Sequence, residues 1–186
     1  METPFHVVLH EPVIPQNTGS IARLCACTGA VLHLIHPLGF EITAARLKRA
    51  GLDYWDHVDV REHASWGAFL EAEKPLEMFF LSKKAHKNFT HASFPPGSYL
   101  VLGSETKGLP EAWFDQYEGR FLQIPMRTHL VRSLNLAQAA AVVLYEALRQ
   151  NDFSTISVLP STLAQEASSA SAETSGLGTA LGLTDL

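Results

Sequence analysis

The stretch Gly103-Ser104-Glu105-Thr106-Lys107-Gly108-Leu109-Pro110 completes and follows a short β-rich run of the 186-residue chain, Tyr99–Gly103. Its glycine spacing is that of a phosphate-binding loop, but Leu109 and Pro110 stand where such a loop requires lysine and then serine or threonine. A nucleoside triphosphatase is therefore excluded. What remains is a polar loop bracketed by glycines, in which backbone can approach a ligand and Glu105 can accept hydrogen bonds. A plain turn is the open alternative.

Around this stretch, short β-rich runs alternate with amphipathic stretches over residues 1–150. The alternation predicts an α/β fold with a mainly parallel six-stranded sheet and helices on both faces. The expected strands are Phe5–Leu9, Val31–Ile35, Val58–Arg61, Met78–Ser82, Tyr99–Gly103 and Phe121–Pro125. The first expected helix begins near Thr18 and ends at Gly29. Three further helices are expected over Thr43–Ala50, Trp66–Glu73 and Leu134–Gln150. The strongly apolar last helix is expected to be sandwiched between other elements or placed in a subunit interface.

Parallel sheets bind ligands beyond the carboxyl ends of their strands, so two further post-strand segments stand out. His10–Ser20 is a proline-punctuated loop that feeds a helix whose N–H groups can hold an anion, with Asn17 or Thr18 as an ordinary N-cap in the simpler interpretation. Ile124–Leu136 opens the last helix with polar side chains, and Ser133 as an N-cap is again the simpler interpretation. Lys83 and Lys84 follow the fourth predicted strand. They could contact phosphates, and the simpler interpretation is that they lie in a solvated loop.

Composition bounds the class of protein. The chain is 46% hydrophobic and 18% charged, which is typical of a soluble domain with a core. No apolar run approaches the roughly 20 residues of a membrane helix, and the start has no signal-peptide pattern. Two cysteines, Cys25 and Cys27, are too few for a disulfide framework. We expect a cytoplasmic protein without a membrane partner.

The net charge of -5 at first disfavours a nucleic-acid partner. Four of the 19 acidic residues lie in residues 151–186, however, whereas all 14 lysines and arginines lie in residues 1–150 beside the other 15 acids. The first segment is therefore close to neutral, with bases near the post-strand loops. Residues 151–186 are rich in serine, alanine, threonine, glycine and leucine, and we expect a low-complexity extension to which no function is assigned.

Several chemistries lack their sequence signatures. There is no GxSxG turn of a serine hydrolase and no GxGxxG after the first strand. Cys25 and Cys27 point in different directions on a helix, and the nine histidines form no HExxH pattern. No metal site is expected.

Four motifs together resemble the SPOUT class of trefoil-knotted RNA 2'-O-methyltransferases. The motifs are Glu11-Pro12-Val13-Ile14-Pro15-Gln16-Asn17-Thr18-Gly19 with Arg23, Arg49-Ala50-Gly51-Leu52-Asp53-Tyr54, Gly103–Pro110, and Ile124-Pro125-Met126 with Arg132-Ser133-Leu134-Asn135-Leu136. The resemblance runs from about Phe5 to Gln150, so residues 1–150 are expected to form the methyltransferase domain. More narrowly, the chain resembles the small bacterial tRNA methyltransferases that modify a wobble cytidine or uridine. It implies an α/β fold with a C-terminal trefoil knot.

The resemblance also implies a cofactor, S-adenosyl-L-methionine, which leaves as S-adenosyl-L-homocysteine, and no metal. The positions that match the family's cofactor-binding residues are Leu81, Gly103, Ile124, Met126, Ser133 and Leu134. Arg23, Ser133 and Asn135 match its catalytic positions. Because an arginine normally stays protonated, Arg23 is expected to bind a phosphate and to polarise the ribose 2'-hydroxyl, which attacks the sulfonium methyl.

Substrate contacts are implied for Asn17, Arg23, Glu105, Arg132 and Tyr145. For Tyr145, burial in a dimer interface is the equal alternative. Family members are homodimers, so we expect a homodimer that grips the tRNA anticodon stem-loop and methylates nucleotide 34, with leucine isoacceptors as expected substrates. Two alternatives stay open, which are a methyltransferase of the same class acting at another tRNA or rRNA position, and a catalytically silent RNA-binding protein on this scaffold.

Overall fold

The computed structural model describes residues 4–41, 55–127, 129–154 and 156, and within them a sheet of seven parallel strands. The strands are β1 (His6–His10), β2 (Val31–Ile35), β3 (Val60–His63), β4 (Met78–Leu81), β5 (Lys87–Asn88), β6 (Tyr99–Leu102) and β7 (Phe121–Gln123). They are arranged in the order β3-β2-β1-β6-β4-β7-β5, and every pair in the sheet is parallel. The predicted parallel α/β fold is confirmed.

The expected number of six strands was wrong by one. The additional strand, β5, is only two residues long and pairs with β7 at the sheet's edge. A segment of two residues carries no alternation of apolar and polar side chains, so periodicity could not reveal it. The expected trefoil knot stays a prediction.

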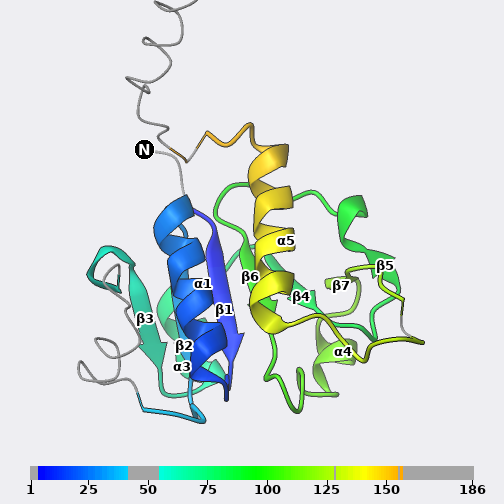
Figure 1. Ribbon diagram of the computed structural model, residues 1–186, viewed down its shortest axis with the longest axis horizontal. Helices are drawn as coiled ribbons and strands as arrows, with labels where there is room; N and C mark the ends of the chain where they lie inside the picture. Colours follow the sequence, from blue (N-terminus) through cyan, green and yellow to red (C-terminus); the bar gives the residue numbers. More distant parts are fainter. Residues whose placement is uncertain (1–3, 42–54, 128, 155, 157–186) are drawn as a thin grey trace, which may run out of the picture. The chain divides into compact units, whose positions relative to one another are not determined.

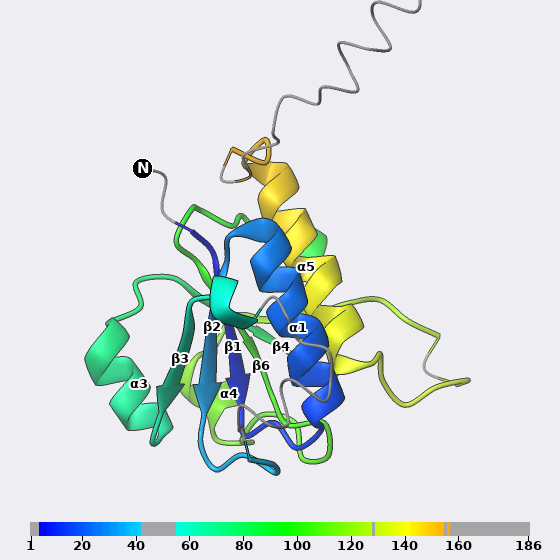
Figure 2. The same cartoon turned by 60° about the vertical axis from the view of Figure 1, so that its left-hand side comes forward.

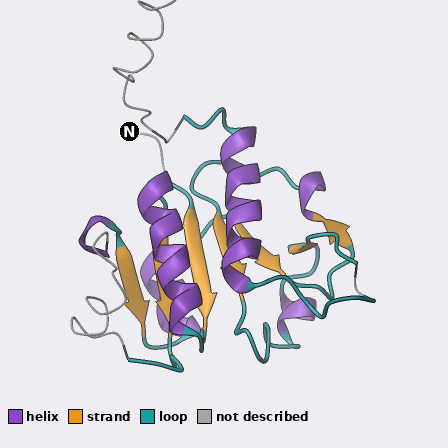
Figure 3. Ribbon diagram, in the orientation of Figure 1, coloured by secondary structure: helices purple, strands orange, loops and turns teal. Residues whose placement is uncertain are grey.

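Within the described residues, four helices and two 3₁₀ turns accompany the strands. They are α1 (Pro15–Thr28), α3 (Trp66–Glu73), α4 (Trp113–Gln116), α5 (Leu136–Gln150), η1 (Trp55–His57) and η2 (Phe89–His91). Helices α1 and α5 lie side by side on one face of the sheet (Figures 1 and 2), whereas α3 and α4 pack against the other face. Figure 3 shows the first pair in front of the strands. The expected helix Thr43–Ala50 lies outside the described residues, and α4 was not expected.

The starts of α1 and α5 differ from the expected ones. Helix α1 begins at Pro15 rather than near Thr18, with Ile14 at the N-cap and no side-chain cap. Proline suits the first helical position because its fixed φ and missing N–H cost nothing there. The N-cap of α5 is Asn135, whose side chain accepts from two backbone N–H groups, so the expectation of Ser133 was wrong. Helix α1 ends as expected, at Gly29 with a φ of 71°.

The core is split by the sheet into two layers. Under α3 and α4, the face of the sheet carries large aromatic side chains centred on Phe80, which is fully buried. Its ring stacks on Phe121 at a centroid distance of 5.0 Å and on Tyr117 at 4.6 Å. On the opposite face, Val143, Leu144 and Ala147 of α5 are completely buried. One side of α5 is therefore packed against the sheet, whereas Val142 and Tyr145 on the helix are exposed, so the expectation that α5 is sandwiched or placed in a subunit interface stays a prediction.

The chain divides into two units, Met1–Thr155 and Ile156–Leu186, and all the elements above belong to the first. Nearly all of the second unit lies outside the described residues, so the expectations for residues 151–186 stay predictions. No helix among the described residues is long and apolar enough to cross a membrane.

Replacing Phe80 by alanine should lower the free energy of unfolding by about 3–5 kcal/mol, because it empties the centre of the aromatic layer. Leu76→Ala is the matched control, since Leu76 is 93% exposed, and its effect should stay within about 0.5 kcal/mol. Urea unfolding followed by circular dichroism measures both. Equal losses in the two variants would contradict this account of the core.

Candidate functional site

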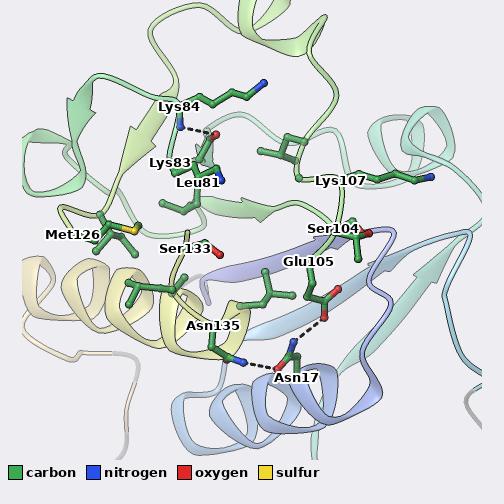
Figure 4. A pocket seen from close by; sticks show the side chains of 18 of the residues that line it. Asn17, Leu81, Lys83, Lys84, Ser104, Glu105, Lys107, Met126, Ser133 and Asn135 are labelled. Atoms are coloured by element: carbon green, nitrogen blue, oxygen red, sulfur yellow. Dashed lines mark hydrogen bonds between the residues drawn. The ribbon is translucent and has the colours of Figure 1, made fainter. Parts of the chain in front are cut away.

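A cavity of about 560 Å³ lies at the carboxyl ends of β4, β6 and β7, beside the start of α5. This is the edge at which parallel α/β sheets bind ligands, and the volume is that of a small-molecule site. Figure 4 shows the lining side chains converging from the three post-strand loops and from α1 and α5. They are Ile14, Asn17, Leu81, Ser82, Lys83, Lys84, Ser104, Glu105, Thr106, Lys107, Gly108, Leu109, Phe114, Ile124, Met126, Ser133, Leu134, Asn135, Leu136 and Ala139.

A chain of side-chain hydrogen bonds along the floor of this cavity joins the start of α5, helix α1 and the loop after β6. Asn135 Nδ2 donates to Asn17 Oδ1 at 2.9 Å, and Asn17 Nδ2 donates to Glu105 Oε1 at 2.9 Å. Both bonds are drawn in Figure 4. Asn135 Oδ1 also accepts from the N–H groups of Ala137 and Gln138, at 2.9 and 3.3 Å. The amide of Asn135 therefore caps α5 and holds α1 at the same time.

Glu105 closes the other end of the chain. Its Oε2 accepts from Val13 N at 2.9 Å, and its Oε1 accepts from Ile14 N at 3.3 Å as well as from Asn17. These backbone groups immediately precede α1, whose positive dipole end favours a negative charge. The sequence indicated that this helix start can hold an anion, and the structure supplies one from within the chain, the Glu105 carboxylate. Asn17, predicted as an N-cap in the simpler interpretation, uses its side chain in this network instead.

Gly103 shapes the loop that carries Glu105. A Cβ atom at this position would lie 2.3 Å from the carbonyl carbon of Gly108 and 2.4 Å from Leu109 N. The loop folds back on the strand end through a hydrogen bond from Gly108 N to Ser104 O at 2.8 Å, with Gly108 at a φ of +73°. Only glycine permits both features. The bracketing glycines are therefore required by a tight return of the chain.

Three lysines give the cavity a positive rim. Lys83 Nζ donates to Arg132 O at 3.3 Å, which connects the loop after β4 to the segment before α5. Lys84 forms an exposed ion pair with Glu111. The side chain of Lys107 points away from the centre of the cavity in Figure 4. The solvated-loop interpretation of Lys83 and Lys84 was incomplete, because both side chains line the cavity.

Most of the predicted site residues meet in this cavity. Those that line it are Asn17, Leu81, Glu105, Ile124, Met126, Ser133, Leu134 and Asn135. Those that do not are Arg23, Gly103, Arg132 and Tyr145. Arg23 is exposed on α1, off the buried stripe as predicted, and six residues beyond Asn17 correspond to about 9 Å along the helix. Tyr145 is exposed on α5.

Sequence reasoning missed two kinds of residue at the cavity. The loop residues Ser82, Ser104 and Thr106 directly follow or adjoin strand ends, so their position was a usable signal. Phe114 comes from α4, a single turn that nothing in the pattern announced.

The comparisons with known proteins match this geometry. Residues 4–145 match the model of the SpoU rRNA Methylase family. The tRNA (cytidine(34)-2'-O)-methyltransferase of Burkholderia pseudomallei is 48% identical over 153 residues, which cover 80% of this chain and 97% of that protein.

Two of the solved structures that match the chain illustrate the shared fold. One, described as giving structural insights into the 2-OH methylation of C/U34 on tRNA, is 48% identical with a TM-score of 0.74 and covers 81% of this chain and 97% of its own. The other is the SpoU methyltransferase AviRb of Streptomyces viridochromogenes in complex with the cofactor AdoMet. It is 26% identical with a TM-score of 0.70, and the match covers 82% of this chain and 59% of that one. The family match spans well over half of the sequence, and the chain belongs to the SpoU methylase family, within the SPOUT class that its four motifs resemble.

Proposed function

We propose that this protein transfers a methyl group from S-adenosyl-L-methionine to the ribose 2'-hydroxyl of nucleotide 34 of tRNA, a cytidine or modified uridine. The observation that carries the proposal is the 48% identity to a tRNA (cytidine(34)-2'-O)-methyltransferase over 97% of that protein's length. The cavity supports it, since eight of the residues expected from the family motifs line one space. Leucine isoacceptors and a cytoplasmic location are part of the proposal.

The cavity suits S-adenosyl-L-methionine in size and in chemistry. Apolar side chains from three different segments, Leu81, Met126 and Leu134, can enclose an adenine ring. Ile124 and Ser133 complete the set of expected cofactor-binding residues that line the cavity. When bound, the cofactor supplies a methyl group activated by a positively charged sulfur. No resident metal is needed for this chemistry.

The chain's own residues would then position the RNA and manage one proton. The Ser133 hydroxyl lines the cavity and can hydrogen-bond either the cofactor or the ribose. Arg23 would bind the adjoining phosphate and polarise the 2'-hydroxyl. Asn17, Asn135 and Glu105 spend their hydrogen bonds on one another and on backbone, so we assign them the positioning of the loops. Arg132, exposed beside Lys83, would add a phosphate contact.

A homodimer belongs to this proposal because α5 carries a second apolar face. Val142 is 40% exposed and Tyr145 is 47% exposed, on a helix whose other side is buried against the sheet. The rings of Tyr145 and Phe153 lie 6.3 Å apart and extend this apolar patch. A two-fold related copy would cover it. The anticodon stem-loop would then lie against bases from both subunits.

The test of the function is methyl transfer from labelled S-adenosyl-L-methionine to bulk tRNA by the full chain, with the product mapped by mass spectrometry of nuclease fragments. The expected result is one methyl group on the ribose of nucleotide 34. A methyl group at another tRNA position, or on rRNA alone, would replace the proposed substrate. No transfer to either RNA would indicate a catalytically silent RNA-binding protein.

Replacing Arg23 by lysine should lower the single-turnover methylation rate by about 100-fold or more, because lysine keeps the charge but not the planar donor pair. Cofactor affinity should be unchanged, since Arg23 does not line the cavity. Arg120→Lys is the matched control, because this exposed residue pairs with Glu77 outside the cavity lining. An Arg23→Lys enzyme that keeps most of its rate would remove Arg23 from the mechanism.

In the wild-type protein, Val13 N, Ile14 N and Asn17 Nδ2 all donate hydrogen bonds to the Glu105 carboxylate. Replacing Glu105 by glutamine turns one of the two acceptor oxygens into an N–H₂ donor that faces these groups. We expect cofactor affinity and methylation rate each to fall by about tenfold or more, since a hydrogen bond to a charged group is worth roughly 1.5–3 kcal/mol. Glu118→Gln, at an exposed carboxylate that does not line the cavity, is the control and should change neither value. Isothermal titration with the cofactor and rate measurements decide. Normal values in Glu105→Gln would show that the network does not assemble the cavity.

A further inference from the structure

A second cluster of chemically active side chains lies on the face of the sheet that α3 and α4 cover. The parallel register places His6, His33 and His63 on that one face, from β1, β2 and β3 respectively. All three are buried, His33 completely. His6 Nδ1 lies 2.9 Å from His33 Nε2, and His33 Nδ1 lies 3.0 Å from His63 Nε2. None of these rings lines the cofactor cavity.

A carboxylate from α3 completes this cluster. Glu73, in the last turn of α3, accepts a hydrogen bond from Arg61 on Oε2 at 2.8 Å. Its other oxygen, Oε1, faces His33 Nδ1 and His63 Nε2 at 3.9 Å each, which is too long for a hydrogen bond. Arg61 is itself held by two bonds to Asp59, at 3.1 and 2.7 Å. The carboxylate is therefore fixed with one oxygen directed between the two imidazoles.

We propose that His33 Nδ1, His63 Nε2 and Glu73 Oε1 form a binding site for a divalent transition-metal ion of the zinc type. The three atoms stand 3.0, 3.9 and 3.9 Å from one another. The nearest point equidistant from the three atoms lies in their plane, about 2.1 Å from each, and this is the bond length of zinc to imidazole nitrogen and to carboxylate oxygen. Two imidazoles and one carboxylate are a zinc ligand set that leaves one further coordination position.

The hydrogen bond between His33 Nδ1 and His63 Nε2, at 3.0 Å, means that one of these two nitrogens carries a proton. That proton leaves when an ion takes its place between the rings, so binding of the ion should be weaker at lower pH. His6 acts as the outer partner, because its Nδ1 can accept the N–H of His33 Nε2 once Nδ1 of His33 binds the ion. His6, His33 and Glu73 also offer ligand atoms within 4.8 Å of one another.

The cluster is held firmly but lies close to a route of entry. The ring of Phe69 packs edge-on against both His33 and His63, at 5.4 and 5.2 Å. Tyr99 stacks on His6 at 4.0 Å, and its hydroxyl lies near Glu73. Strand β3 is the edge of the sheet, and the Arg61 side chain beside Glu73 is 41% exposed. An ion can therefore enter by displacement of one partly exposed arginine, and once bound it would tie α3 to β2 and β3.

The experiment titrates the untagged, chelator-treated full chain with Zn²⁺, and with Co²⁺ as a coloured substitute. The expected result is one ion per chain, with the visible absorption of Co²⁺ bound to nitrogen and oxygen, and a higher melting temperature with Zn²⁺. The variants His63→Gln and Glu73→Gln should each weaken binding by about tenfold or more. Glu71→Gln, an exposed carboxylate on the same helix, and His91→Gln, an exposed histidine, should leave the affinity within about twofold.

Two results would overturn the proposal. One is the absence of stoichiometric binding by the wild-type chain, and the other is equal affinity in all four variants, which would place the ion on the surface. Should His63→Gln or Glu73→Gln fail to fold, X-ray absorption of the wild-type zinc complex decides. Two imidazole ligands and one carboxylate support a site in this histidine cluster, and any other ligand set refutes it.

Discussion

The cavity depends on the hydrogen bonds that the Glu105 carboxylate accepts. It accepts hydrogen bonds from two backbone N–H groups before α1 and from the side chain of Asn17, and through Asn17 it is linked to Asn135 at the start of α5. These residues are separated by up to 118 positions in the chain. A single charged group thereby holds three post-strand segments against one another.

The tight return at Gly103 serves the same end. Because no Cβ fits at Gly103, the chain turns back directly at the end of β6 and brings Glu105 beneath the start of α1. The apolar walls from Leu81, Met126 and Leu134 then face each other across the cavity. The positive rim from Lys83, Lys84 and Lys107 lies around it. The charge of Glu105 is thus used within the protein, and the rim of the cavity stays positive.

The parallel sheet and most of the site could be predicted from the sequence, because both follow from local signals. Strands such as Met78–Leu81 are continuous apolar runs, and residues after strand ends collect at one edge of a parallel sheet. Starts of helices were less predictable. Asn17 looks like an N-cap by residue type, yet a partner 88 residues away takes its side chain. The pairing of β5 and the single turn of α4 depend on tertiary contacts that carry no periodic pattern.

The histidines show the same limit more sharply. His6, His33 and His63 are 27 and 30 residues apart, so no spacing motif joins them, and no metal site was expected from the sequence. Only the register of β1, β2 and β3 places their rings in a row, and only α3 adds the carboxylate. Metal-site motifs with short spacing describe ligands on one element. Sites built across a sheet need the strand order first.

Asn135 contributes both to the stability of the first turn of α5 and to the stability of the cavity floor. Its one amide completes the first turn of α5 and also carries the bond to Asn17, so the first turn of the helix and the floor of the cavity form or melt together. Fraying of this helix end is therefore coupled to loss of the binding site, and a bound ligand would slow hydrogen exchange at amides that it never touches, such as those of Ala137 and Gln138. In this protein, local folding of one helix end and occupancy of the cavity are linked equilibria.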